Sequence, residues 1–195
     1  MRQLEIGPSC EWGRLGDDWE TMDNEDFEYV DIIHDIHDIP FPIEDSTYDL
    51  VYMAHVLEHV HWQQSVEVLK EVHRIIKPGG NIEVWTPDLN KILAATINYD
   101  AVPQHERKVV AYSRYTDEDI PQFEWINQKI FTYRHDPGKG GQLHEAIFNP
   151  EMMEYCLDKA GFVDLHNLDT PRGPYPQYHG WCQFGMCGKK REDDA

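Results

Sequence analysis

The stretch from His55 to His59 contains the side chains with the clearest capacity for chemistry. It reads His55-Val56-Leu57-Glu58-His59 and fits the HxxEH pattern, in which two histidines four residues apart share one helical face and a glutamate can act as a base. A third zinc ligand would come from Glu71, Glu124 or His144. The pattern is compatible with a zinc-dependent hydrolase. However, His55 directly follows a predicted strand, whereas this motif requires the middle of a long helix.

Strands and helices predicted along the first half of the chain must position this stretch. Apolar segments that end in turn residues predict strands at 3–7, 19–23, 28–34 and 48–54. Apolar spacings of three and four predict a helix over 56–76, interrupted near His61, and Lys77-Pro78-Gly79-Gly80 ends it before a strand at 81–86. Strands that alternate with helical connections indicate a parallel α/β sheet.

The second half of the chain is less regular. Weak periodicity over 88–148 predicts helices at 89–98, 103–113 and 118–131 and a mobile loop at 136–141. Asn149-Pro150 begins a further helix that Gly161 ends, and two late strands follow at 162–168 and 180–187. No linker divides the chain, so residues 1–195 are expected to form one domain with 88–148 as an insertion.

Composition excludes several classes of protein. The 195 residues carry a net charge of −19, which argues against a general nucleic-acid binder because such proteins neutralise phosphates with lysine and arginine. No apolar run approaches the roughly 20 residues of a membrane helix, and the N-terminus has no secretory signal pattern. The four cysteines form no CxxC pair, so we expect reduced thiols in an acidic, cytoplasmic protein.

Four segments, in this order, resemble the class I S-adenosylmethionine-dependent methyltransferases. They read LEIGPS, HDIHDIPFPIEDSTYDLVYMAHVLEHV, LKEVHRIIKPGGNIEVWTPDL and HEAIFNPEMMEYCLDKAGF. The chain more closely resembles short methyltransferases that begin directly at the first strand. The resemblance implies a Rossmann-like, mostly parallel seven-stranded sheet of order 3-2-1-4-5-7-6, with an antiparallel last strand and helices on both faces. It also implies S-adenosylmethionine as the cofactor and makes 88–148 a substrate-side insertion.

The resemblance assigns cofactor-binding positions to the ends of the first four strands. Gly7 would let the backbone approach the cofactor, Asp23 would accept the ribose hydroxyls, and Asp35 would face the adenine amino group. The full set that it implies is Glu5, Gly7, Pro8, Ser9, Asp23, Asp35, Ile36, Met53 and Ala54. The loop departs from the family's GxGxG, since it reads Gly7-Pro8-Ser9-Cys10-Glu11, and the first helix must be short or missing. A non-catalytic nucleotide-binding homologue is therefore an alternative.

Three histidines are the candidate catalytic bases. HVLEH recurs in methyltransferases after the fourth strand, which assigns His55 and His59 to the reacting end, and His144 lies in a stretch where similar enzymes have a residue near the substrate. Imidazole suits proton removal from a hydroxyl or amine because its pKa is near neutral. The aromatic and polar residues of 88–148 favour a small polar or sugar-like acceptor for O- or N-methylation. On this interpretation the chain is an enzyme without a metal and has no nucleic-acid or membrane partner.

Overall fold

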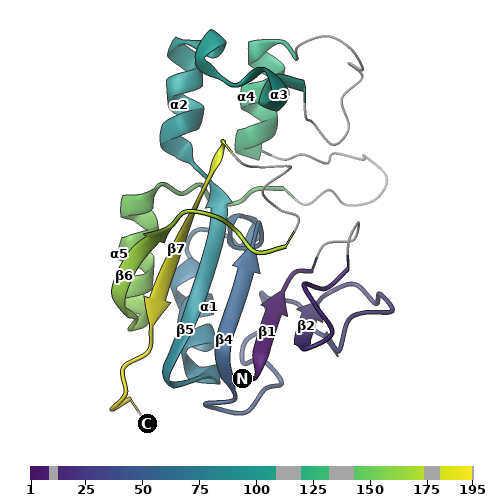
Figure 1. Cartoon of the computed structure of the whole chain (residues 1–195), viewed down its shortest axis with the longest axis vertical. Coiled ribbons are helices and arrows are strands. Elements are labelled where there is room, and N and C mark those ends of the chain that lie inside the picture. The colour runs from purple at the N-terminus through teal and green to yellow at the C-terminus, as the bar shows by residue number, and fades with distance from the viewer. Residues whose placement is uncertain (9–12, 109–119, 132–142, 174–180, 195) are drawn as a thin grey trace.

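A seven-stranded sheet forms the centre of the computed structural model, which describes residues 1–8, 13–108, 120–131, 143–173 and 181–194 (Figure 1). The strand order is β3-β2-β1-β4-β5-β7-β6, as expected. In the described chain, β7 runs antiparallel to both neighbours and the other pairs are parallel. The strands are β1 (Gln3–Ile6), β2 (Trp19–Asp23), β3 (Ile32–Ile33), β4 (Tyr48–Ala54), β5 (Ile76–Pro87), β6 (Val163–Leu168) and β7 (Gln183–Lys189).

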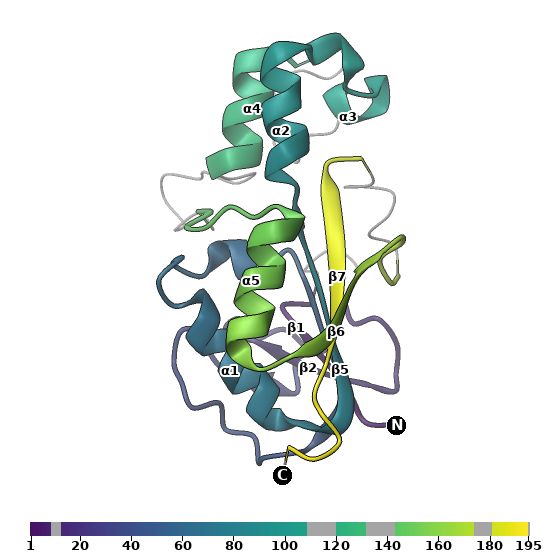
Figure 2. The same cartoon turned by 90° about the vertical axis from the view of Figure 1, so that its left-hand side faces the viewer.

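Helices cover one face of this sheet. Helices α1 (Ser65–Ile75) and α5 (Pro150–Ala160) pack side by side there over the main apolar core (Figure 2). On the other face, a smaller cluster around Tyr52 and Trp85 packs against Leu15 and Leu168, none of which belongs to a helix. Helices were expected on both faces of the sheet, and among the described residues they cover only one of them. The reason is the short connection from β1 to β2, whose described part forms no helix.

The predicted helix over 56–76 is two elements. The 3₁₀ turn η1 (Leu57–His59) follows β4, and α1 begins at Ser65, so the predicted interruption near His61 is confirmed. Helix α1 ends at Ile75, and β5 starts at the next residue instead of after the glycines. The predicted strand at 28–34 is much longer than β3, because only Ile32 and Ile33 pair with β2.

A helical layer lies beyond the carboxyl ends of β4 and β5 (Figure 1). It contains α2 (Leu89–Ile97), η2 (Tyr99–Ala101), α3 (Gln104–Lys108) and α4 (Gln122–Phe131), packed around a buried cluster that includes Trp125. Helices α2, α3 and α4 lie within the predicted ranges 89–98, 103–113 and 118–131, but α4 begins later than predicted because residues 120 and 121 are not helical. Residues 109–113 and 118–119 and the predicted loop at 136–141 lie outside the described residues. No helix in the described ranges is both long and apolar enough to cross a membrane.

Candidate functional site

Gly7 ends β1 in a conformation that needs glycine. Its φ is +71°, and its amide donates to the Met22 carbonyl of the neighbouring strand over 2.9 Å. A Cβ at this position would lie 2.3 Å from Cγ2 of Val56, the residue before η1. Strand β1 therefore ends in bare backbone at the point where it meets the segment after β4.

Glu5 is buried and holds the loop after β1. Its exposed fraction is 1%, and its Oε2 accepts a hydrogen bond of 2.8 Å from the Leu15 amide. This bond connects β1 to the last part of the loop before β2. The geometry makes Glu5 a residue that shapes the loop. Pro8 follows Gly7 in the same loop, and Ser9 lies outside the described residues.

One carboxylate, Asp23, is the last residue of β2, and another, Asp35, follows β3 by two residues. Asp23 is partly buried, and its Oδ1 accepts from the Glu25 amide over 2.9 Å. Burial raises the pKa of Asp23 above its ordinary value and outweighs that hydrogen bond. The Asp23 carbonyl accepts from the His34 amide, which brings the residues after β3 beside the end of β2.

Asp35 is held by a neighbour in sequence. Its Oδ1 accepts from the His37 amide over 2.9 Å and lies 2.7 Å from the His37 imidazole Nδ1. Burial raises the pKa of Asp35, but the two hydrogen bonds and the His37 charge together hold it below its ordinary value. Ile36 packs against the main core beside it. Gly7, Asp23 and Asp35 form what we call the β1–β3 edge.

Strand β4 delivers two buried apolar residues and then His55 to the same edge of the sheet. Met53 and Ala54 are 0% and 4% exposed. His55 has a φ of +57°, and both of its ring nitrogens have side-chain partners. Nδ1 lies 3.0 Å from Glu58 Oε1, and Nε2 lies 2.9 Å from Gln183 Oε1 at the start of β7.

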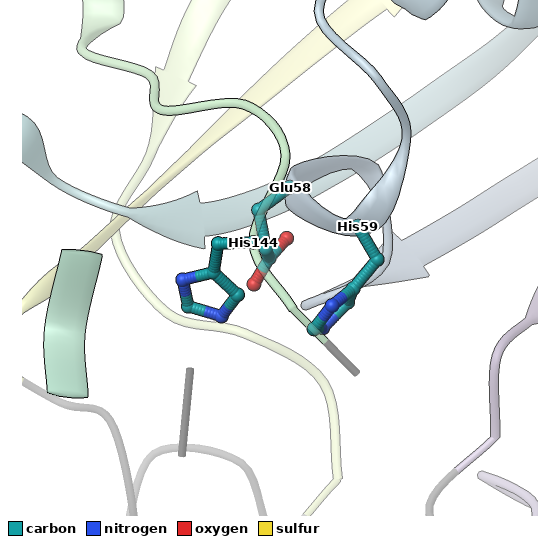
Figure 3. Close-up of side chains that lie close together, drawn as sticks. All are labelled: Glu58, His59 and His144. Atoms are coloured by element: carbon teal, nitrogen blue, oxygen red, sulfur yellow. The ribbon is translucent and has the colours of Figure 1, made fainter. Parts of the chain in front are cut away.

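His59 and His144 meet beside Glu58, and we call these three residues the His–Glu cluster (Figure 3). The two imidazole ring centres are 4.9 Å apart. The Glu58 carbonyl accepts the amides of Glu145 and Ala146 over 2.8 and 3.1 Å, which ties the segment containing His144 to η1. Main-chain hydrogen bonds thereby join two segments that lie far apart in the sequence.

Each histidine of the His–Glu cluster is oriented by a backbone carbonyl. His59 Nδ1 lies 3.1 Å from the Leu143 oxygen, and His144 Nδ1 lies 3.2 Å from the Lys129 oxygen. A carbonyl can only accept, so Nδ1 carries the proton in both rings and Nε2 carries the lone pair. Burial lowers the pKa of His144, helped by the charges of His59 and His55 and opposed by Glu58.

Glu58 lies at the centre of this arrangement and is 2% exposed. Burial raises its pKa, but the His55 hydrogen bond and the nearby histidines outweigh that effect and lower it below the ordinary value. Its Oε1 faces His55, and among the described residues its Oε2 has no hydrogen-bond partner. The sequence pattern indicated Glu58 only as the possible base of a zinc site, and it did not predict the contact of Glu58 with His144.

The HxxEH interpretation is wrong in its pairing of His55 with His59. The pattern lies in a strand end and a 3₁₀ turn instead of a long helix, so His55 and His59 lack the one-turn helical spacing on which the motif depends. Among the residues that the structure describes, the group able to share an ion is Glu58, His59 and His144. Glu71, one predicted third ligand, instead binds Arg74 and the Phe41 amide.

Gln183 is a site residue that the sequence did not indicate. It is 4% exposed and lies 128 positions from His55 along the chain. No local pattern marks it, because its place beside His55 results from the antiparallel pairing of β7 with β5. Cys182 and Cys187 are buried, and burial raises the pKa of each thiol to about 11, in agreement with a packing role.

Comparison with known proteins gives matches in sequence and in fold. Residues 18–84 match the model of the methyltransferase domain family. A curated relative, an uncharacterized methyltransferase-like protein of Schizosaccharomyces pombe, is 33% identical over 111 residues, which cover 55% of this chain and 36% of the relative. The chain thus spans about a third of that relative's length.

Solved structures of methyltransferases share the fold at low identity. An S-adenosylmethionine-dependent methyltransferase from Archaeoglobus fulgidus superimposes with a TM-score of 0.55 at 13% identity, covering 97% of this chain and 86% of that one. A putative methyltransferase solved with the Trm112 activator of Haloferax volcanii gives 0.54 at 12% identity, covering 97% and 82%. The sequence match includes the second segment and most of the third, and the solved structures show that the fold is the one that the resemblance implied.

Proposed function

We propose that this chain, which shares the fold of S-adenosylmethionine-dependent methyltransferases and matches the methyltransferase domain family over residues 18–84, is a class I enzyme of this kind that methylates a small polar or sugar-like molecule. One observation carries the cofactor-binding part of the proposal: Gly7 and Asp23 lie at the ends of neighbouring parallel strands, at the edge where α/β sheets bind ligands. Gly7 has no room for a side chain, and Asp23 keeps a partly buried carboxylate.

The residues of the β1–β3 edge suit S-adenosylmethionine, the cofactor of this family. Asp23 would accept the ribose hydroxyls, Gly7 would present bare backbone, and Asp35 with the Ile36 backbone would face the adenine. The Asp23 carboxylate is partly desolvated, and among the described residues no lysine, arginine or histidine forms an ion pair with it. This supports its use as an acceptor, because a hydrogen-bond donor would stabilise it. Met53 and Ala54 would line the methionine end, and Pro8 and Ser9 the loop.

Glu5 has a positioning role in this proposal. Its carboxylate holds the Leu15 amide, so it would keep the loop after β1 in the shape that the cofactor needs. When bound, S-adenosylmethionine supplies a methyl group that is already electrophilic. The chain therefore has to bind, orient and deprotonate the acceptor and exclude water.

The acceptor side would lie between the His–Glu cluster and the layer of α2 to α4. His59 and His144 are the better candidates for a base, since each presents an Nε2 lone pair fixed by a backbone carbonyl at Nδ1. His55 is held at both nitrogens by Glu58 and Gln183, so we propose that it orients Glu58. Residues 88–148 would supply the acceptor pocket as a substrate-side insertion.

A turnover assay with matched variants tests the proposal. The purified chain is incubated with S-adenosylmethionine and a panel of small polyhydroxylated and amino compounds, and release of the demethylated cofactor is measured. We expect release that depends on one acceptor class, is lost in Asp23→Ala and is kept in Asp26→Ala, an exposed control from the same loop. Cofactor binding without turnover on any compound would favour a non-catalytic homologue instead.

A further inference from the structure

We propose that Glu58, His59 and His144 form a binding site for one divalent first-row transition-metal ion. Each residue offers one ligand atom, and these atoms all lie within 4.8 Å of one another (Figure 3). Two imidazoles and one carboxylate are a donor set that zinc and other first-row ions accept, with positions left open for further ligands. The site differs from the HxxEH pattern because His144 takes the place of His55.

The buried carboxylate of Glu58 independently indicates a cation. Glu58 is 2% exposed, its Oε1 faces His55, and within the described part of the chain its Oε2 has no hydrogen-bond partner. A carboxylate oxygen that is withdrawn from water without a partner is costly. A metal ion between the two imidazole rings would give that oxygen its missing partner.

The outer contacts of the three ligands match those of metal-binding residues. A histidine that binds a metal through one nitrogen usually donates its other ring N–H to a carbonyl or carboxylate. His59 and His144 donate Nδ1–H to the carbonyls of Leu143 and Lys129, which directs Nε2 toward ligation. His55 contacts Oε1 of Glu58, the oxygen that would not face the ion, and thereby orients the carboxylate.

The main chain holds the two ligand-bearing segments together before any ion binds. The Glu58 carbonyl accepts from the Glu145 and Ala146 amides, the two residues that follow His144. A site whose ligands are already positioned loses less conformational freedom on binding. The cluster therefore has the ligand types, the outer contacts and the rigidity of a metal site.

The open coordination positions would accept an oxygen of the methyl acceptor, and this part of the inference rests on the proposed function. A divalent ion polarises an oxygen that binds to it and lowers the pKa of a hydroxyl or water. The acceptor class that fits is a hydroxyl compound with a second oxygen able to bind the same ion. With the ion bound, His59 and His144 would be ligands, so the role of base proposed above for them applies only to the protein without the ion, and the ion itself would lower the pKa of the acceptor hydroxyl.

Direct metal titration tests the site without knowledge of the acceptor. The chain, produced without a histidine tag, is stripped with a chelator, dialysed and titrated with Zn²⁺ by calorimetry and with Co²⁺ by absorption spectroscopy. We expect one ion per chain and a Co²⁺ spectrum of low coordination number. Glu58→Gln and His59→Ala should each weaken metal binding at least about tenfold, because loss of a residue that only contacts a ligand already lowers metal affinity by that factor.

His166→Ala is the matched control. His166 also places Nδ1 beside a backbone carbonyl, that of Asp164, but it lies on β6 away from the His–Glu cluster. Its substitution should leave the affinity unchanged, and thermal unfolding of each variant would establish that it folds. Equal affinity in wild type, Glu58→Gln and His59→Ala, or no binding by folded wild type, would overturn the proposal.

Titration of the same proteins with S-adenosylmethionine separates this inference from the proposed function. Cofactor binding without metal binding would overturn the metal site and leave the methyltransferase proposal standing. Metal binding without cofactor binding would overturn the proposed function and leave the site itself standing.

Discussion

The carboxylates of the β1–β3 edge are held by neighbours in sequence, whereas the His–Glu cluster is held by distant parts of the chain. Asp23 accepts from Glu25 and Asp35 from His37, two residues away in each case. The cluster instead depends on contacts between η1, the end of α4 and the segment around His144. Substitutions of the two carboxylates, Asp23 and Asp35, should therefore affect ligand binding with little effect on stability, and substitutions in the cluster should affect stability as well.

Gly7 closely approaches Val56, the residue before η1, and its substitution should have the largest effect on stability. In Gly7→Ala the new Cβ would lie 2.3 Å from Val56 Cγ2 at a φ of +71°. The left-handed backbone costs about 1–2 kcal/mol for alanine, and overpacking adds about 1–3 kcal/mol. Chemical denaturation measures the loss.

Gly13→Ala is the matched control for this prediction. Gly13 has a φ of +72°, but its Cβ would meet Tyr29 at an ordinary 3.5 Å. Only the backbone cost of about 1–2 kcal/mol should appear. The double variant Gly7→Ala with Val56→Ala should recover part of the difference, and equal losses in Gly7→Ala and Gly13→Ala would contradict the contact.

Glu58→Ala should destabilise the protein more than removal of an exposed carboxylate. It removes the charged acceptor of the His55 ring, a hydrogen bond worth about 1.5–3 kcal/mol. Glu67→Ala is the comparison, because Glu67 forms an exposed pair with Lys70 on α1 that should contribute under about 1 kcal/mol. A smaller loss in Glu58→Ala than in Glu67→Ala would refute the structural role of the cluster.

Asp23→Asn should separate ligand binding from stability. The amide keeps an acceptor for the Glu25 amide, so the turn should survive. Loss of a charged hydrogen bond of about 1.5–3 kcal/mol should weaken S-adenosylmethionine binding about 10- to 100-fold. The free energy of unfolding without ligand should stay equal or rise, since a partly buried charge is removed.

The raised pKa of Asp23 gives the smallest effect, a pH dependence with a defined sign. The folded state binds the Asp23 proton more tightly than the unfolded state does. Protonation of Asp23 therefore contributes fully to the free energy of unfolding below the ordinary pKa of 3.8, and this contribution is lost as pH rises through the raised pKa. Cofactor affinity should change in the opposite direction and weaken as pH falls through that raised pKa. Titrations of wild type and Asp23→Asn over a pH series measure both, and identical profiles would exclude Asp23 as the source.

Local sequence patterns predicted most strand and helix ends, and the resemblance supplied the strand order that the structure confirms. The cofactor-binding roles of Gly7, Asp23 and Asp35 stay predictions. Strand ends, the Gly7 turn and the Asn149 cap, whose side chain accepts from the Met152 amide, are each determined by a few adjacent residues. The length of β3 was predicted less well. Pairing with β2, and not β propensity, decides where that strand ends.

The His–Glu cluster could be predicted only in part. The spacing of His55 and His59 suggested one helical face, but His55 adopts a left-handed backbone after β4 and the helix does not form there. His144 was identified from the resemblance, whereas its contact with His59 depends on the Glu58 carbonyl binding two later amides. Such long-range pairings leave no periodic signal in the sequence.

Calorimetric titration with S-adenosylmethionine tests the central claim most directly. The account predicts one cofactor per wild-type chain, an affinity that falls about 10- to 100-fold in Asp23→Asn, and no such fall in Asp26→Asn. Absence of binding by the folded wild-type protein, or equal affinity in wild type and Asp23→Asn, would contradict it.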